Sequence, residues 1–323
     1  MLTDNFGRRF SYLRLSITDV CNFSCTYCLP DGYQCDQPRD FLSIPEIKRI
    51  TKAFAELGTE KIRITGGEPA LRKDLPEIIQ ICKETPGIKK VAITSNGFKL
   101  PEHLPLWLEA GIDAINISID SLDPRQFLAI TGHDKLKTIL KGIDMAVADG
   151  RASVKVNTVL MREHSGKDIQ SYLNWLKDTP ITLRFIELMQ TGDNKAFFDA
   201  QHVQGSRIKQ NLILDGWLPV IQNKSAGPAQ EFYHPDYQGK VGLIMPYSKD
   251  FCNTCNRLRI SSSGKLHLCL FGEEGLSLRE QLQSDDIEPL QAKILGLLGD
   301  KKATHYLHEK LTGATKHLAM LGG

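Results

Sequence analysis

The chain has 323 residues, of which 41% are hydrophobic and 24% are charged, and its formal net charge is +2. This length suits one large domain and a smaller one, and the small net charge gives no reason to expect nucleic acid or a membrane surface as a partner. No apolar run is long enough to cross a bilayer. The first residues form no apolar signal segment and the chain has eight cysteines. We therefore expect a cytoplasmic protein whose cysteines bind metal.

Six short segments have the composition and alternation of β-strands, namely 12–18, 61–65, 90–94, 114–119, 154–159 and 181–187. Between most of them, apolar residues recur at steps of three and four, over 44–57, 75–82 and 169–176. This alternation of strand and helix predicts βα units and a parallel sheet. Because a closed barrel of this kind has eight units, the predicted fold class is α/β, with an incomplete (β/α)6 TIM-like barrel.

The predicted strands carry polar residues on one face and apolar residues on the other. A closed barrel usually fills its interior with bulky branched side chains. If the apolar faces here pack on the helices, Arg14, Arg63, Lys155 and Arg184 point into the barrel. Burying these charges without a partner would be too costly, so we infer a large anionic ligand inside. The alternative is that some of these strands lie at an edge with their polar faces in water.

Three cysteines, Cys21, Cys25 and Cys28, follow the first predicted strand directly. They would lie at the carboxyl end of the barrel, where the active sites of such folds are found. A protein-held iron–sulfur cluster takes four thiolates. With three in one loop and no close fourth, a four-iron cluster would keep one iron open to a small molecule. Zinc and disulfides are the alternatives, and the spacing favours the cluster.

Residues 191–323 form a predicted smaller domain, which contains a second set of three cysteines. Cys252 and Cys255 precede a predicted hairpin, and Cys269 lies on its return strand. The sequence leaves two metals open here, because His267 could complete a Cys3His zinc site. Arg257 and Arg259 share one face of the first hairpin strand and suit a phosphate chain, although a solvated face is the alternative.

The chain ends in Gly322 and Gly323, which are typical of a frayed terminus but also make a thin tail that could enter a crowded site.

Gly66 and Gly67 begin a Gly-Gly-Glu-Pro element after the second predicted strand, where glycines allow a ligand to approach the backbone closely. Together with the first cysteine loop, this element resembles the radical S-adenosylmethionine (SAM) superfamily. The resemblance implies that SAM binds the open iron and yields a 5′-deoxyadenosyl radical on reduction.

The sequence resembles one family within that superfamily closely, the GTP 3′,8-cyclases of molybdenum cofactor biosynthesis. The most specific matches are 14–16 leading to the first cysteines, 61–69, 184–187, 191–194, 252–259 with Cys269, and the final two glycines. This family converts GTP to (8S)-3′,8-cyclo-7,8-dihydroguanosine 5′-triphosphate. The resemblance implies two [4Fe-4S] clusters, one held by Cys21, Cys25 and Cys28 and the other by Cys252, Cys255 and Cys269.

The same resemblance implies the roles of further residues. Around SAM it implies Tyr27, Gly67, Ser118 and Met189. Around GTP it implies Arg14, Arg63, Thr94, Lys155, Arg257, Leu258 and Arg259, with Lys61 and Arg184 as further candidates near the phosphates. Gly322 and Gly323 are implied to reach the active site as catalytic tail residues.

The implied partners are GTP, an external one-electron donor and a downstream cyclic pyranopterin monophosphate synthase, and a homodimer is compatible with the sequence. The main alternative is a radical SAM peptide-maturing enzyme with an auxiliary cluster, which would need neither the Arg257 and Arg259 pair nor the glycine tail. A non-catalytic zinc-stabilised binding module is a third class. The inward-facing arginines argue against that module, because a purely structural barrel has no use for them.

Overall fold

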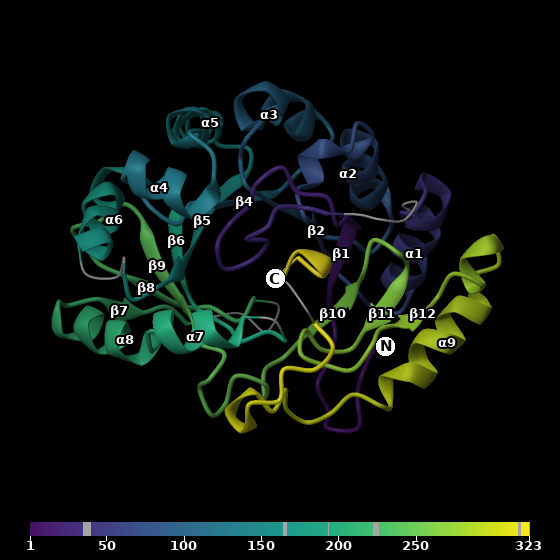
Figure 1. Cartoon of the computed structure of the whole chain (residues 1–323). Coiled ribbons are helices and arrows are strands. Elements are labelled where there is room, and N and C mark those ends of the chain that lie inside the picture. The colour runs from purple at the N-terminus through teal and green to yellow at the C-terminus, as the bar shows by residue number, and fades with distance from the viewer. Residues whose placement is uncertain (35–39, 164–166, 193, 222–225, 316–317, 323) are drawn as a thin grey trace.

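The computed structural model describes residues 1–34, 40–163, 167–192, 194–221, 226–315 and 318–322, and its strands form one 12-stranded sheet (Figure 1). The strand order is β12-β11-β10-β1-β2-β3-β4-β5-β6-β9-β8-β7. The run from β10 to β9 is parallel, and the strands outside it pair in antiparallel fashion. The sheet curves into an open barrel, as predicted. The strands are β1 Tyr12–Thr18, β2 Lys61–Gly66, β3 Lys90–Ser95, β4 Ala114–Ser118, β5 Ser153–Leu160, β6 Thr182–Glu187, β7 Leu218–Pro219, β8 Gln230–Tyr233, β9 Lys240–Ile244, β10 Arg257–Ile260, β11 Lys265–His267 and β12 Leu276–Ser277.

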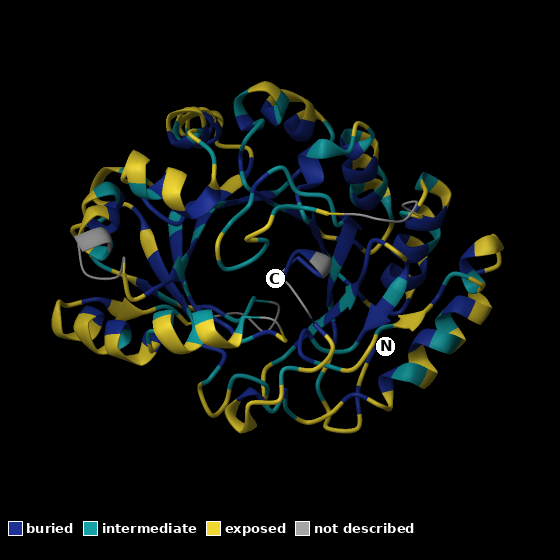
Figure 2. Ribbon diagram, in the orientation of Figure 1, coloured by how far each residue is buried: buried dark blue, intermediate teal, exposed yellow. Residues whose placement is uncertain are grey.

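The helices lie mainly on the outer side of the curved sheet (Figure 1). They are α1 Ile44–Glu56, α2 Leu75–Glu84, α3 Leu100–Glu109, α4 Pro124–Thr131, α5 Leu136–Asp149, α6 Lys167–Asp178, α7 Lys195–Gln201, α8 Gly205–Leu214 and α9 Glu288–Leu298. Their apolar faces pack on the apolar faces of the strands, with Leu13, Ile64 and Ile115 among the fully buried core residues. Figure 2 shows the buried strands inside and the exposed residues on the outward faces of the helices.

All six predicted strands and the hairpin of β10 and β11 are present. The return strand β11 ends at His267, however, so Cys269 follows it and does not lie on it as predicted. The barrel is larger than predicted, because β9 and β10 from the second half of the chain extend the parallel sheet beside β6 and β1. The sheet therefore crosses the predicted domain boundary at residue 190, and the division itself remains a prediction. No helix in the described residues has the length and apolar character needed to span a membrane.

Local composition also predicts a loop over 191–200 and a surface helix over 301–311, and both predictions are wrong. Part of 191–200, predicted as loop, belongs to helix α7. The predicted surface helix over 301–311 contains only a 3-10 turn, Leu307–Glu309, because Tyr306 and Lys310 on either side adopt positive φ values. His305 is buried there, and its Nε2 lies 2.9 Å from the carbonyl oxygen of Pro246.

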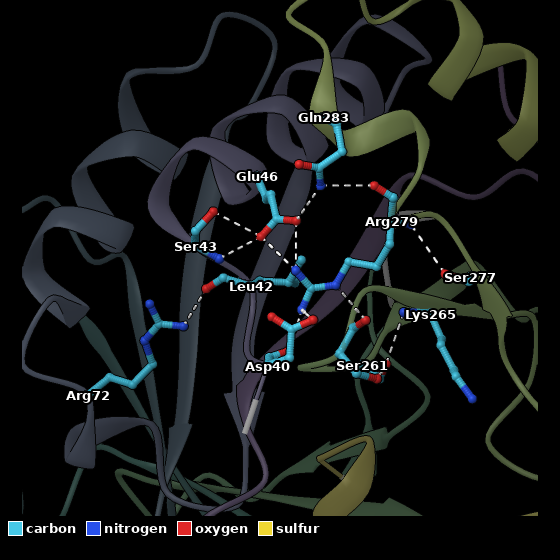
Figure 3. A network of polar contacts seen from close by, with 11 residues as sticks. Asp40, Leu42, Ser43, Glu46, Arg72, Ser261, Lys265, Ser277, Arg279 and Gln283 are labelled. Atoms are coloured by element: carbon cyan, nitrogen blue, oxygen red, sulfur yellow. Dashed lines mark hydrogen bonds and ion pairs between the residues drawn. The ribbon is translucent and has the colours of Figure 1, made fainter. Parts of the chain in front are cut away.

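A network of polar contacts fastens the hairpin of β10 and β11 to the start of α1 (Figure 3). The Glu46 carboxylate accepts hydrogen bonds from the backbone N–H of Ser43 and from Nη1 of Arg279, at 2.8 and 2.7 Å. The Nε of Arg279 donates to the carbonyl oxygen of Ser263, in the turn of the hairpin, at 3.0 Å. One buried carboxylate therefore caps a barrel helix and fixes the position of the strand that carries Arg257 and Arg259.

Candidate active site

The polar faces of the strands point into the barrel, as the alternation predicts. Arg14 on β1 lies in register with Arg63 on β2 and with Arg259 on β10. Two residues earlier along β1, Tyr12 lies in register with Lys61 and Arg257. Parallel neighbours in register project side by side on the same face of the sheet. The barrel interior therefore contains two adjacent rows of cationic side chains, with Tyr12 among them.

These cations line a cavity that we call the substrate cavity, after the residues that the resemblance assigns to GTP. Its cationic lining consists of Arg14, Lys61, Arg63, Arg184, Arg257 and Arg259. Its other polar and thiol residues include Tyr12, Thr94, Asn116, Asn157, Cys252, Cys255 and Cys269. No Asp or Glu is found among its described lining residues.

Burial and repulsion between neighbouring cations shift the pKa values of side chains in the substrate cavity. Burial and the charge of Arg259 hold the pKa of Arg14 well below its usual value. Burial also lowers the pKa of Lys61 to about 8, and burial together with Arg257 lowers the pKa of Arg259 to about 10. Burial alone would raise the pKa of Tyr12, but Arg63, Lys61 and Arg14 outweigh it and lower that pKa to about 6. All four shifts favour states with less positive charge, as expected where cations crowd together without a ligand.

Two residues expected near the substrate do not line this cavity. The Nζ of Lys155 lies 3.0 Å from Oε1 of Glu231, and Nη2 of Arg184 lies 3.1 Å from the same oxygen. Lys155 is thus held at the edge of the cationic rows by a carboxylate that it shares with Arg184. The side chain of Leu258 belongs to the hydrophobic core on the outer face of β10 and so points away from the substrate cavity.

A second cavity, of about 850 Å³, lies at the carboxyl ends of the strands, and we call it the SAM cavity. It is lined by the first three cysteines, Cys21, Cys25 and Cys28, and by all four residues that the resemblance assigns to SAM, Tyr27, Gly67, Ser118 and Met189. Burial raises the pKa of Cys21 to about 11 and that of Cys28 to about 12. The hydroxyl of Tyr27 donates to Oδ2 of Asp120 at 2.8 Å, which fixes the ring on the wall of the cavity.

The glycine pair allows the cysteine loop to pack against the end of β2. At Gly66, which has φ of +140°, a Cβ atom would lie 2.0 Å from the carbonyl oxygen of Thr18. At Gly67 it would lie 2.3 Å from the carbonyl oxygen of Val20. Neither position accommodates a side chain, so the backbone of the loop that carries the cysteines rests directly on these two residues.

The C-terminal tail enters the SAM cavity, within the curve of the sheet (Figure 1). Leu318 and Leu321 pack with Met189, Leu270 and Phe271 in a small apolar cluster. Beyond that anchor, Gly322 lines the cavity with φ of +57°, and a Cβ there would lie 2.0 Å from Oγ1 of Thr65. Gly323 lies outside the described residues.

The two cavities adjoin, and Thr94, Asn157, Ile186 and Met189 line both. The first cysteine triad lines the SAM cavity and the second lines the substrate cavity. The two triads therefore line two adjoining cavities. This arrangement allows a small molecule in the substrate cavity to contact a second one in the SAM cavity.

Each triad consists of free, half-buried thiols, a donor set suited to iron. Within the described residues, no three His, Cys, Asp or Glu side chains are grouped as a site for a single metal ion. His267, the candidate fourth zinc ligand, does not line the cavity that the second triad shares. Cys82 is buried in the core, and Cys35 lies outside the described residues.

Several lining residues were not singled out from the sequence, chiefly Tyr12, Asn116, Asn157, Phe251 and His305. The two asparagines were detectable, because strand alternation already placed them on the polar face. Phe251 and His305 come from irregular segments, where no periodicity indicates which side chains point inward.

Comparison with known proteins defines the class first. Residues 15–176 match the Radical SAM superfamily, and residues 181–307 match the family described as Molybdenum Cofactor Synthesis C. The structure of Streptococcus suis SuiB bound to S-adenosylmethionine is similar, with a TM-score of 0.62 at 12% identity, covering 90% of this chain and 68% of SuiB. A SuiB structure bound to the precursor peptide SuiA has a TM-score of 0.58 at 14% identity. At such identities the likeness shows the fold alone. The chain is a radical SAM protein, with SAM and an iron–sulfur cluster as its cofactors.

Sequence relatives define the family. A GTP 3′,8-cyclase of Psychromonas ingrahamii is 56% identical over 323 residues, covering 100% of this chain and 95% of the relative. A GTP 3′,8-cyclase of Pectobacterium atrosepticum is 55% identical over 325 residues, covering 100% of this chain and 99% of the relative. One of Yersinia pestis is 54% identical with the same coverage. The chain therefore belongs to the GTP 3′,8-cyclase family.

Proposed function

We propose that this chain converts GTP to (8S)-3′,8-cyclo-7,8-dihydroguanosine 5′-triphosphate, in the first step of molybdenum cofactor biosynthesis. The observation that carries the proposal is that the cation-lined substrate cavity adjoins the SAM cavity, with four lining residues in common. A nucleoside triphosphate supplies the negative charge that the buried cations lack. With its phosphates among the cations, its ribose would lie near the shared wall of the two cavities and so close to SAM.

The cationic side chains bind and orient the substrate. Arg14, Arg63 and Arg184 are assigned to the phosphates, because guanidinium groups bind phosphate oxygens bidentately. Lys61 is assigned to them as well, since its ammonium group binds phosphate as a point charge. Thr94 lies at the junction of the cavities, where its hydroxyl accepts a hydrogen bond from Arg63 at 3.1 Å and so fixes the direction of that guanidinium. Leu258 contributes through its backbone, and Lys155 through the field of its ammonium group beside Glu231.

Cys252, Cys255 and Cys269 would hold a second [4Fe-4S] cluster, which would supply an iron for the guanine of GTP. This assignment is supported by the position of the triad on the substrate cavity, next to Arg257 and Arg259. Three thiolates leave one iron free for a ligand atom of the base. A structural zinc ion would be fully ligated and could not serve in this way.

In the SAM cavity, Cys21, Cys25 and Cys28 would hold the first cluster, and Tyr27, Gly67, Ser118 and Met189, which line the same cavity, would contact SAM. When bound, these two cofactors would supply the radical chemistry needed to remove the 3′ hydrogen of the ribose. The tail up to Gly322 closes the cavity and excludes water from it, since its apolar anchor packs with Met189. The family resemblance extends this role to Gly323, which lies outside the described residues. Side reactions of a radical are suppressed in a closed site.

The reaction requires an external one-electron donor, and its product serves a downstream cyclic pyranopterin monophosphate synthase. We place the protein in the cytoplasm, where thiols stay reduced. Its assembly state is a monomer or a homodimer.

The decisive experiment incubates anaerobically purified protein with SAM, a reductant and GTP deuterated at C3′. We expect a product with the mass of unlabelled GTP, deuterium in the 5′-deoxyadenosine and about eight irons per chain. The Cys252→Ser variant should retain about four irons and still cleave SAM reductively, since the first triad is intact. SAM cleavage without a GTP isomer, and with modification of an added peptide, would favour a peptide-maturing enzyme. Zinc at the second triad would contradict the second cluster.

A further inference from the structure

Asn116 on β4 is a buried polar side chain that the roles proposed above leave unused. It is 3% exposed and lines the substrate cavity. Its Oδ1 atom is buried and accepts no hydrogen bond from any described residue. A buried amide oxygen without a donor is costly, and in native proteins such atoms usually have a partner. A ligand in the cavity can supply that donor.

The sheet places Asn116 next to the junction of the two cavities. It lies in register with Thr94 on β3, which lines both cavities. Two residues further along β4, Ser118 lines the SAM cavity and lies in register with Asn157, which also lines both. Asn116 is thus on the substrate side of this junction. It lies closer to the carboxyl ends of the strands than the row that contains Arg14 and Arg63.

The chemistry at this position narrows the choice of partner group. Given the proposed function, on which this inference rests, the ribose must lie at the junction, because its 3′ hydrogen is transferred toward SAM. Phosphate oxygens in their ionised form accept hydrogen bonds and cannot satisfy an amide oxygen, whereas ribose hydroxyls can donate. The cationic rows already provide for the phosphates.

We propose that Asn116 is a specificity-determining residue whose amide oxygen accepts a hydrogen bond from the 2′- or 3′-hydroxyl of the GTP ribose. Unlike the cationic residues, which bind the phosphate charge, Asn116 recognises a hydroxyl group of the ribose. It would therefore discriminate ribonucleotides from deoxynucleotides. A site built to hydrogen-bond a hydroxyl rejects the analogue that lacks it, since its own polar atom is then left unpaired.

The test measures equilibrium affinities by anaerobic calorimetry for GTP, 2′-deoxy-GTP and 3′-deoxy-GTP, which requires no turnover. In the wild type we expect one deoxy analogue to bind about tenfold more weakly than GTP. In Asn116→Leu we expect the affinity for GTP to fall about tenfold, while the affinity for that deoxy analogue stays close to its wild-type value. Unchanged discrimination in Asn116→Leu, or an equal loss for all three nucleotides, would overturn the proposal.

Ser16→Ala is the matched control, because Ser16 on β1 is also buried with an unpartnered hydroxyl oxygen but lines neither cavity. We expect all three affinities to stay unchanged in it. If iron content or circular dichroism shows that Asn116→Leu is misfolded, Asn116→Ser is measured in its place with the same expectations. Absence of GTP binding in the wild type would instead reject the proposed function.

Discussion

Arg63 donates a hydrogen bond from Nε to the hydroxyl of Tyr12 at 2.5 Å, and Nζ of Lys61 lies 4.4 Å from the centre of the same ring. Tyr12 is buried at the level of Lys61 and Arg257, among side chains of one sign. A phenolate at this point partly neutralises the cations while no nucleotide is bound. Tyr12 is thus a local counterion whose charge should depend on whether the phosphates are present.

The first prediction concerns the pH dependence of GTP binding. The charges of Arg63, Lys61 and Arg14 lower the pKa of Tyr12 to about 6 in the free protein, and burial lowers that of Lys61 to about 8. Bound phosphates would raise both pKa values, so the complex holds more protons than the free protein. GTP affinity should therefore fall as pH rises from 7 to 9.

Calorimetry in buffers of different ionisation enthalpy checks this directly. We expect the wild type to take up protons on binding GTP at pH 7.5, and Tyr12→Phe to take up fewer and to show a shallower pH dependence. The sign of the stability effect follows from the same shift. A lowered folded-state pKa means that Tyr12 stabilises the free protein increasingly as pH rises above about 6, and that this contribution disappears as pH falls through 6. Identical proton uptake in both proteins would contradict this role.

The second prediction separates substrate binding from cluster assembly. Arg14→Ala and Arg257→Ala each remove a guanidinium from the substrate cavity. Charge-assisted hydrogen bonds contribute about 1.5–3 kcal/mol, so GTP affinity should fall by about 10- to 100-fold in each variant. Iron content should stay at the wild-type level, because neither residue is a cysteine ligand. Unchanged affinity in both variants would remove these residues from the proposed site.

Sequence reasoning located most of the site because strand periodicity and cysteine spacing are local signals. Alternation alone predicted that Arg14 and Arg63 point inward, and the register of β1 with β2 places them side by side. It could not predict that β9 and β10 complete the barrel, because pairing between strands distant in sequence depends on tertiary packing. For the same reason, the Glu231 partner of Lys155 was missed, since β8 joins the sheet only through β9.

The third prediction concerns the carboxylate of Glu231. Burial alone would raise the pKa of Glu231, but Lys155 and Arg184 outweigh it and lower that pKa. In Glu231→Gln the two cations lose their shared partner, so the free energy of unfolding of the nucleotide-free protein should fall by about 2 kcal/mol. GTP can then replace the missing charge. The rise in Tm on adding GTP should therefore be larger in Glu231→Gln than in the wild type, as measured by calorimetry. An equal or smaller rise would show that the nucleotide does not reach these cations.

The last prediction tests the tail. Gly322 has φ of +57°, and a Cβ at this position would lie 2.0 Å from Oγ1 and 2.7 Å from Cβ of Thr65, so an alanine cannot occupy the observed position. Because Leu318 and Leu321 anchor the tail separately, Gly322→Ala should displace only the end of the chain. We expect near-native Tm and iron content, with turnover of GTP reduced by at least about tenfold, since a displacement of about 1 Å in an active site can cost 100-fold.

Gly296→Ala provides the control for this prediction, because Gly296 lies in helix α9 and a Cβ there meets no atom within 4 Å. Its turnover should match the wild type, and its Tm should be equal or higher because alanine favours the helix. Gly323→Ala tests the next residue in the same way, with lower turnover expected. Full activity in both Gly322→Ala and Gly323→Ala would mean that the tail is a frayed end, and that the SAM cavity is closed by Leu318 and Ala319, which also line it.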